Sequence, residues 1–369
     1  MAILELQRMD ELADFATGWN QLLSKSLDNH PFLTSEWLSL WWKHFGKGKE
    51  LKLFTAESSG AVSLVVPVMY STHKVLGSKR SKAEFVASGD SDYQSFIVTD
   101  LNSATRNLKQ LIKRIMEDSD VDCIVFGDVP ENSITSRLLE NVNKEAFGGS
   151  HSIINSCPYA LLPYSYDTYL QGLGCRMRKN LKRCEKQASK DYKVELLKYD
   201  KIGTVEDAMK IFFELHQKRR KAKGDRGLFS DNVNRNFHID LANAFAEKGW
   251  LSLFFLTFNG KPVSTIYSYE YNGKLYYYLG GFDPEYSKYG PGQLIIQDVI
   301  KYGIAKQLKE FDFLRGDEAY KKRWKTAIRN NIEFRVPRRG FKSKFYNWNV
   351  NNSSSYYLHG VFSLPQRFF

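Results

Sequence analysis

The order of elements in the second half of the chain is decided by residues 250–315, which read WLSLFFLTFNGKPVSTIYSYEYNGKLYYYLGGFDPEYSKYGPGQLIIQDVIKYGIAKQLKEFDFLR. Three runs rich in aromatic and β-branched residues predict strands at Trp250–Phe258, Pro262–Tyr271 and Lys274–Gly281. They are separated by Asn259-Gly260 and Asn272-Gly273, and such Asn-Gly pairs favour hairpin turns of two residues. We therefore expect an antiparallel meander here.

A loop, a helix and a further strand follow the meander. The loop Phe282–Gly290 is rich in Tyr, Pro and Gly, and Pro291 is well placed in the first turn of a helix over Pro291–Lys306. A last strand is predicted at Glu310–Leu314. Upstream of the meander, periodicity predicts helices at Tyr166–Gly172, Met177–Lys190, Thr204–Lys221 and Asn232–Lys248.

The first part of the chain also mixes helices with strands. One helix is predicted at Met9–Ser24, a second begins after a cap at Thr34 or Ser35, and a third is predicted at Ala104–Glu117. Strands are predicted at Leu51–Glu57, Val62–Tyr70, Phe96–Thr99 and Cys123–Phe126. The stripe formed by Trp37, Trp41 and Trp42 is interpreted as core. We therefore predict a mixed α/β protein with domains at residues 1–160 and 161–345 and a tail at 346–369.

Composition and charge narrow the function classes. The 369 residues are 43% hydrophobic and carry 53 Lys and Arg against 41 Asp and Glu, a net charge of +12, which excludes a disordered or low-complexity chain. All of the basic excess lies after residue 150, where it suggests either an anionic partner or a solvated basic face. We expect no membrane span, no secretory signal and no metal site, and we expect a cytoplasmic protein.

The loop before the last helix has the features of a phosphate cradle. It reads Ser287-Lys288-Tyr289-Gly290-Pro291-Gly292-Gln293. A helix N-terminus offers unpaired amides, and glycine allows a phosphate to approach the backbone, although many plain turns share this pattern. Over Tyr276–Leu314 the chain resembles the acyl-CoA motif R/Q-x-x-G-x-G/A of the GNAT acyltransferases. Ser287 replaces the Arg or Gln of that motif, and Lys288 is expected to compensate.

A second resemblance runs through much of residues 30–325. The segment Phe311–Trp324, which reads FDFLRGDEAYKKRW, resembles the signature of the CelD-like, cellulose-biosynthesis-associated branch of the GNAT superfamily, which is related to the Fem peptidyltransferases. Similar matches to that branch are His30-Pro31-Phe32, Arg178–Lys186 and Phe282–Tyr286. The resemblance implies two GNAT-like domains in tandem, each a mixed, mostly antiparallel sheet flanked by helices, with the acyl-CoA site in the second.

Acyl transfer to an amine requires a base, a stabilised oxyanion and a proton for the leaving thiolate. Glu270 and Asp317 are the candidate bases, and Tyr320 is the candidate acid, since many GNAT enzymes carry a Tyr after this strand. Each has an ordinary alternative: Glu270 as an exposed hairpin carboxylate, Asp317 as a helix cap and Tyr320 as a packing residue.

Two basic stretches are candidates for substrate binding. Arg178, Lys182 and Lys186 share one helix face that could clamp an anionic acceptor, or could simply be solvated. Lys321 belongs to Glu318–Lys344, where ten basic residues, two acidic residues and several aromatic rings are mixed, a composition that also suits nucleic acid.

The preferred interpretation is an N-acyltransferase. It would move an acyl group, with acetyl preferred, from CoA to an amine, and the resemblance suggests an amino sugar of an envelope polysaccharide or its precursor, with or without phosphate. Two alternatives stay open: a Fem-like transferase that uses aminoacyl-tRNA, and a nucleic-acid-binding protein without catalysis. The sequence makes no prediction of an oligomeric state.

Overall fold

The computed structural model describes residues 3–6, 18–58, 60–75, 78–118 and 121–338. The chain divides into two compact units, and each is described by itself. Unit 1 comprises residues 1–156 and 329–369, and unit 2 comprises Cys157–Ile328. No helix within the described ranges is long and apolar enough to cross a membrane.

Unit 2 is built on a mixed sheet with the strand order β7-β12-β11-β10-β9-β8. The strands are β7 (Ser150–Leu161), β8 (Val194–Lys198), β9 (Leu251–Phe258), β10 (Lys261–Tyr271), β11 (Lys274–Phe282) and β12 (Glu310–Asp312). β9, β10 and β11 form the expected antiparallel meander, and β8 pairs antiparallel with β9 at its edge. β11 and β12 are parallel because the helix between them carries the chain back across the sheet.

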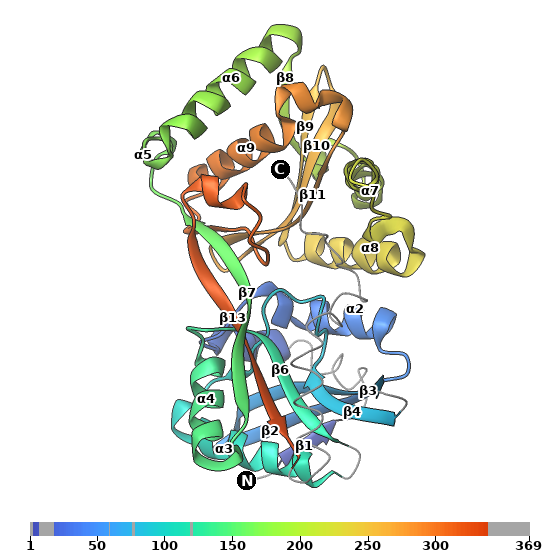
Figure 1. The fold of residues 1–369 in the computed structure, drawn as a ribbon, viewed down its shortest axis with the longest axis vertical. Coiled ribbons are helices and arrows are strands. Elements are labelled where there is room, and N and C mark those ends of the chain that lie inside the picture. Colours follow the sequence, from blue (N-terminus) through green and yellow to red (C-terminus); the bar gives the residue numbers. More distant parts are fainter. Residues whose placement is uncertain (1–2, 7–17, 59, 76–77, 119–120, 339–369) are drawn as a thin grey trace. The chain divides into compact units, whose positions relative to one another are not determined.

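Helices cover both faces of this sheet (Figure 1). On one face lie α5 (Tyr166–Gly172), α6 (Cys175–Asp191) and α9 (Pro291–Ala305), whose apolar residues join one buried cluster with the strands. On the other face lie α7 (Val205–Lys221) and α8 (Asn232–Glu247). There Phe212 packs against Tyr267, and Phe245 packs against Tyr269. The helices and strands predicted over residues 166–314 are confirmed.

Unit 1 has a second mixed sheet with the order β1-β2-β3-β4-β6-β13, and β5 pairs with β3. Its strands are β1 (Ile3–Leu6), β2 (Glu50–Ser58), β3 (Ala61–Val75), β4 (Ser78–Phe85), β5 (Ile97–Val98), β6 (Cys123–Pro130) and β13 (Ala327–Pro337). The pairs are antiparallel except β4–β6, which is parallel. Residues 18–25 are helical; the other helices are α2 (Ser35–Phe45), α3 (Leu101–Glu117) and α4 (Ile134–Val142).

The tryptophans of α2 are mostly core residues, as the sequence indicated. Trp37 and Trp41 are buried, and their indole nitrogens donate to Ser91 Oγ at 2.8 Å and Asp90 Oδ2 at 2.6 Å. Trp42 is only half-buried. The predicted helix Met9–Ser24 lies partly outside the described residues. The mixed α/β class with flanking helices is confirmed for both units.

The expected limit of the second domain differs from the structure at its C-terminal side. β13 pairs antiparallel with β6, so the described residues from Arg329 onward belong to unit 1 and not to a domain that runs to residue 345. Ile332, Phe334 and Val336 alternate into the buried cluster of unit 1. Apolar residues at every second position are a strand signal in the sequence, but this stretch was interpreted from its basic and aromatic residues.

Candidate active site

The most informative feature of unit 2 is the point where β11 and β12 separate. Their parallel ladder pairs Lys274 with Glu310, Leu275 with Phe311 and Tyr276 with Asp312, and it ends there. β11 continues to Phe282, whereas β12 ends at Asp312. The edge of β11 beyond Tyr276 is therefore not paired with β12, and its backbone is open to another partner.

A β-bulge coincides with this separation. In the pairing of β10 with β11, Tyr267 faces Leu279 and Ser268 faces Tyr277, so Tyr278 is the extra residue. A bulge bends a strand and increases its twist, which turns β11 away from β12. The backbone just beyond the ladder is thus shaped for close contact with something other than a neighbouring strand.

Two consecutive glycines follow the bulge because β11 is crowded on both sides there. A Cβ at Gly281 would collide with the backbone of α7 at His216, and a Cβ at Gly280 would collide with the hydroxyl of Tyr277. Gly281 therefore lets α7 pack directly on the strand. Arg219 of α7 lies here too, with its guanidinium 3.5 Å from the carbonyl oxygen of Gly280.

Tyr320 reaches this part of β11 from the loop after β12. Tyr320 lies near Tyr277, and Arg219 and Glu318 are close enough to affect the pKa of both phenols. Burial raises the pKa of both phenols, and the charge of Arg219 opposes the rise only in part. Tyr320 therefore keeps its proton at neutral pH and can serve as a proton donor, the role suggested by the sequence.

The two candidate bases lie in different places. Glu270 is at the end of the β10–β11 hairpin, where Tyr302 Oη donates to its Oε2 at 2.8 Å and Lys306 Nζ lies 3.7 Å from its Oε1. Tyr302 is about 16 Å along α9 from Pro291, at roughly 1.5 Å per residue. Asp317 is exposed in the loop that carries Tyr320. The structure thus brings Asp317, and not Glu270, into the same loop as the candidate acid.

The N-terminus of α9 is open. Gly290 adopts the left-handed conformation at φ 65° and ψ 44° and provides no side-chain cap. A Cβ there would lie 2.7 Å from Cys184 Sγ of α6, so glycine is required. Pro291 has no amide hydrogen, and the amides of Gln293 and Leu294 donate to the carbonyl of Gly290. The first amide that α9 can offer to a ligand is therefore that of Gly292.

Gly292 itself has no structural explanation among its neighbours. A Cβ at this position would meet only Phe282, at 3.6 Å, which is ordinary contact. Glycine inside a helix costs about 1 kcal/mol relative to alanine. A residue that weakens the first turn and that no described neighbour demands is consistent with close approach of a ligand to the backbone.

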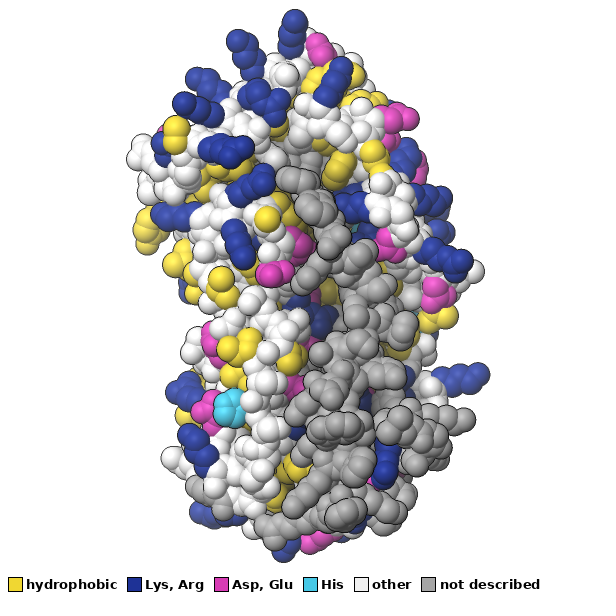
Figure 2. Space-filling view, viewed as in Figure 1, with side chains coloured by type: hydrophobic (Ala, Val, Ile, Leu, Met, Phe, Trp, Pro, Cys, Tyr) yellow, Lys and Arg dark blue, Asp and Glu magenta, His cyan; other side chains and the backbone are white. Residues whose placement is uncertain are grey.

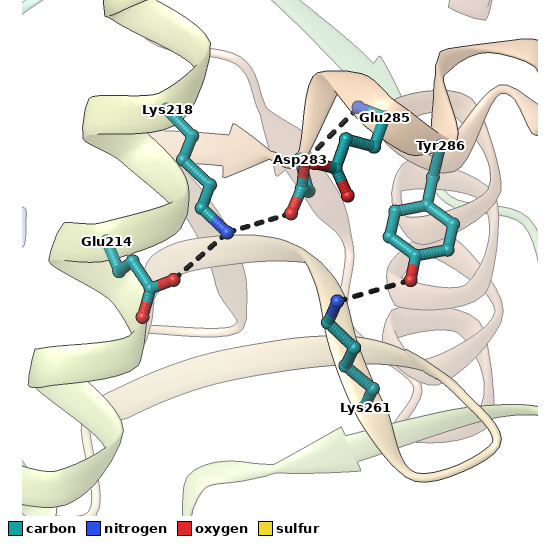
Figure 3. Close-up of polar contacts among 6 residues, drawn as sticks. All are labelled: Glu214, Lys218, Lys261, Asp283, Glu285 and Tyr286. Carbon is teal, nitrogen blue, oxygen red and sulfur yellow. Dashed lines mark hydrogen bonds and ion pairs between the residues drawn. The ribbon is translucent and has the colours of Figure 1, made fainter.

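The loop before α9 is held by an ion pair between the buried Asp283 and the partly exposed Lys218 of α7 (Figure 3). Asp283 is 2% exposed, and its Oδ2 lies 2.9 Å from Lys218 Nζ, which also lies 3.0 Å from Glu214 Oε1. Asp283 Oδ1 accepts from the amide of Glu285 and caps η5 (Pro284–Tyr289). Burial works to raise the pKa of Asp283, but the bonds from Lys218 and Glu285 outweigh it and lower that pKa.

The remaining residues of the predicted cradle have separate places. Ser287 Oγ donates to the carbonyl of Pro284 at 2.6 Å, and Tyr289 is buried and donates to Asp191 Oδ2 at 2.7 Å. Lys288 is exposed, with its ammonium 4.7 Å from the ring centre of Tyr289. Gln293 contacts the amide of Asn180 on α6. Gly290, Gly292 and Gln293 form the start of α9, and Lys288 lies in the loop directly before it.

Two residues expected to contact substrate bond to backbone carbonyls of the protein itself, Lys321 in a buried position and Arg178 in a half-buried one. Lys321 is 3% exposed, and its ammonium reaches the carbonyl of Arg315 at 2.5 Å and Glu318 Oε2 at 2.9 Å. Arg178 donates to the carbonyls of Gln171 and Leu173, both at 2.8 Å, and so closes the end of α5. Both residues therefore stabilise the local backbone. Lys182 and Lys186 are exposed on α6.

Sequence reasoning missed Arg219, Tyr277 and the pair of Lys218 with Asp283. The doublet Gly280-Gly281 inside a strand was a usable signal, because glycine in a strand often marks a bulge or a close backbone approach. No comparable signal marked Arg219, which is one of four consecutive basic residues at the end of α7. Among the described residues, no group of three or more His, Cys, Asp or Glu side chains could hold a metal ion.

Comparison with known proteins agrees with this geometry. Residues 176–322 match the family model described as "Acetyltransferase (GNAT) domain". Among solved structures, FemX is similar with a TM-score of 0.67 and 14% identity, over 94% of this chain and 99% of that chain. None of the curated protein sequences compared with the chain matches it.

Two further structures share the fold over most of both chains. L-PGS from Bacillus licheniformis has a TM-score of 0.53 and 11% identity, over 89% of this chain and 94% of that one. A tandem GNAT protein from the clavulanic acid biosynthesis pathway has a TM-score of 0.50 and 9% identity, over 92% and 100%. At these identities the likeness shows the fold alone, and it extends over most of the chain in each of these structures.

Proposed function

We propose, from the premise of a GNAT-type domain at residues 176–322, that unit 2 transfers an acyl group from acyl-CoA to an amine, with acetyl-CoA as the first donor to test. One observation carries this proposal: β11 leaves β12 after Tyr276, and the next segment ends in the open N-terminus of α9. The strand edge can pair with the amides of an extended donor arm, and Gly290 and Gly292 can receive its pyrophosphate.

The chemistry assigned to the residues follows from their places. Backbone amides of β11 beyond the ladder stabilise the oxyanion when the amine attacks the thioester carbonyl. Tyr320 gives its proton to the departing thiolate. Asp317 is the proposed base, and Glu270 is left out because Tyr302 and Lys306 hold it at the other end of α9.

The proposed acceptor is an amine that carries negative charge nearby. Lys182 and Lys186 are exposed on α6, which packs beside the start of α9 through Asn180 and Gln293. A phosphate-bearing amino sugar, such as a precursor of an envelope polysaccharide, has this chemistry and agrees with the sequence resemblance. The sugar is the part of the proposal that rests on the resemblance alone.

A second candidate is a donor of the aminoacyl-tRNA type. The similarity to FemX extends over both units, and the sequence resembles the branch related to the Fem peptidyltransferases. The same open strand edge could receive an aminoacyl ester, and the basic surface of unit 2 would suit RNA. The acceptor amine and the role of Tyr320 would be unchanged.

One experiment separates these candidates. Calorimetric titration of the whole chain with CoA, acetyl-CoA and aminoacyl-tRNA is followed by mass spectrometry of reactions with glucosamine and UDP-linked amino sugars. We expect saturable binding of acetyl-CoA and an acetylated amine. Transfer from aminoacyl-tRNA without CoA binding would establish the second candidate, and binding of RNA without any transfer would contradict both.

A further inference from the structure

Helix α6 presents one face to the core and an unusual charge pattern to solvent. Met177, Leu181, Cys184 and Ala188 are buried against unit 2. The two acidic residues of the helix bond to residues outside it. Glu185 accepts from Gln297 at 2.6 Å and lies 3.4 Å from Lys301, and Asp191 accepts from Tyr289. The outward face of α6 is thus left without available negative charge.

Five cations line that outward face. They are Arg176, Lys179, Arg183, Lys186 and Lys190, all exposed. At 100° per residue they fall within about 80° of the helix circumference, nearly opposite the buried face, and they extend over about 21 Å. Within the described part of the chain none of the five pairs with a carboxylate. Figure 2 shows Lys and Arg side chains gathered over the region of α6.

This arrangement fits an extended partner better than a small one. Like charges three and four residues apart destabilise a helix, so the row has a cost that a negatively charged partner would remove. A single convex helix contacts a small ligand from one side and through one or two cations only, but it can lie along a flat anionic surface over its whole length. We infer that the outward face of α6 docks unit 2 on the surface of an anionic lipid bilayer.

The surroundings of α6 favour a bilayer over nucleic acid. The segment that enters α5 carries Tyr164, which is fully exposed, and Leu161, which is 66% exposed. Arg178 ties the C-terminal end of α5 to the first turns of α6, and the apolar segment stands at the other end of the short helix α5. Exposed aromatic and apolar side chains beside a basic helix are typical of membrane interfaces. The row itself has no aromatic ring on which a base could stack.

Vesicle co-sedimentation of the whole chain tests this inference without any need for catalysis. Vesicles of phosphatidylcholine are compared with vesicles that contain about one third phosphatidylglycerol, where each cation near the surface strengthens binding about fivefold. The variant Arg176→Gln/Lys179→Gln/Lys190→Gln should bind the anionic vesicles about 100-fold more weakly. The control Lys221→Gln/Lys223→Gln/Arg226→Gln changes the net charge equally on the exposed end of α7 and its loop, and should bind nearly as wild type.

The outcomes are decisive in each direction. Binding that requires phosphatidylglycerol, that weakens at about 0.5 M salt and that is lost only in the α6 variant supports the inference. Equal loss of vesicle binding in both variants would show that only the net charge matters, and would overturn the inference. So would absence of vesicle binding, or an α6-dependent affinity for double-stranded RNA without affinity for vesicles. Circular dichroism of both variants confirms that they are folded.

Discussion

The two units contain the same crossover, and the helix within it starts differently. In unit 1, α3 precedes β6, which pairs in parallel with β4; in unit 2, α9 precedes β12, which pairs in parallel with β11. The start of α9 follows β11 of its parallel pair, whereas the start of α3 lies beside the turn between β2 and β3, where Thr99 bonds to Val62 and Ser63. A helix N-terminus is a position where an anion would be held by free amides and the helix dipole.

In unit 1 the protein fills this position itself. Asp100 caps α3: it accepts from the amide of Asn102 at 3.0 Å and from the hydroxyl of Ser103 at 2.7 Å. The bonds from Ser103, from Ser58 and from the Asn102 amide lower the pKa of Asp100, so the carboxylate stays charged. In unit 2 the same position holds Gly290-Pro291-Gly292 and no side-chain cap. The difference teaches that only unit 2 leaves its crossover helix open to an external anion.

The largest expected effect comes from closing that open end. Gly292→Asp places a carboxylate in the first turn of α9, where the donor pyrophosphate is proposed to lie. We expect acetyl-CoA affinity measured by calorimetry to fall at least about 100-fold, because a fixed like charge replaces a close backbone contact.

The matched control for this variant is Gly174→Asp. Gly174 also precedes a helix, α6, and a Cβ there meets nothing within 4 Å. We expect its acetyl-CoA affinity to equal that of wild type. Unchanged affinity in a folded Gly292→Asp protein would show that the donor is held elsewhere.

The next effect concerns the proton donor beside β11. Tyr320→Phe removes the hydroxyl but keeps the ring that packs on the core of unit 2. We expect kcat to fall about 100-fold with little change in donor affinity, since general acid catalysis contributes about 10²–10⁴. Asp317→Asn should also lower kcat, whereas Glu270→Gln should stay near wild type. A larger loss in Glu270→Gln than in Asp317→Asn would reverse the assignment of the base.

Acid should weaken the unit that holds the open site. Burial, aided by Arg220 and Arg219, lowers the pKa of His216 to about 3, while in the unfolded chain it is near 6.5. The unfolded state therefore binds a proton first as the pH falls, and stability is lost between these values. Between pH 7 and pH 5 we expect the free energy of unfolding to fall by about 2 kcal/mol, at 1.36 kcal/mol per pKa unit. Urea titrations of His216→Phe should show a smaller pH dependence, and an identical one would contradict the assignment.

A smaller effect is expected from releasing the loop before α9. Asp283→Asn removes the charge that holds Lys218, and because Lys218 is partly exposed we expect a loss of only about 1–2 kcal/mol. The pKa of Asp283 is lowered in the folded state, so this contribution is present above pH 3.8 and is lost as the pH falls through the folded pKa. Unfolding at pH 7 and below pH 3 checks this. If the free energy of unfolding of Asp283→Asn differed from that of wild type by the same amount at both pH values, the ion pair would be excluded as the source of the difference.

The smallest effect is expected in unit 1. Asp100→Gly removes the cap of α3 and gives that helix a glycine start. We expect a slightly lower unfolding midpoint, unchanged acetyl-CoA affinity and a stoichiometry of one, because the donor site is in unit 2. A second binding site for acetyl-CoA in this variant would mean that the Asp100 cap alone prevents unit 1 from binding the donor.

Much of unit 2 could be predicted from sequence because its signals are local. The Asn-Gly turns at 259 and 272 define the meander, and Pro291 marks the start of α9. The confirmed strands and helices follow from these signals and from periodicity. The role of Tyr320 stays a prediction, which rests on its motif directly after a strand.

The parts that the sequence does not report depend on contacts between distant segments. Lys321 and Arg178 bond to backbone carbonyls, which their sequence positions do not indicate. Glu270 is held by Tyr302 and Lys306 toward the C-terminal end of α9, and no spacing rule in the sequence predicts that contact. β13 joins unit 1 after a gap of about 200 residues in the sequence, which local patterns cannot report.

The proposed donor site lies in unit 2 alone, at the start of α9 and along β11. Hydrogen–deuterium exchange of the whole chain with and without acetyl-CoA tests it directly. We expect added protection at residues 277–282 and 290–294, and none at residues 100–104, where Asp100 already occupies the start of α3. Protection at residues 100–104, or no change at either helix start while acetyl-CoA binds, would contradict the account.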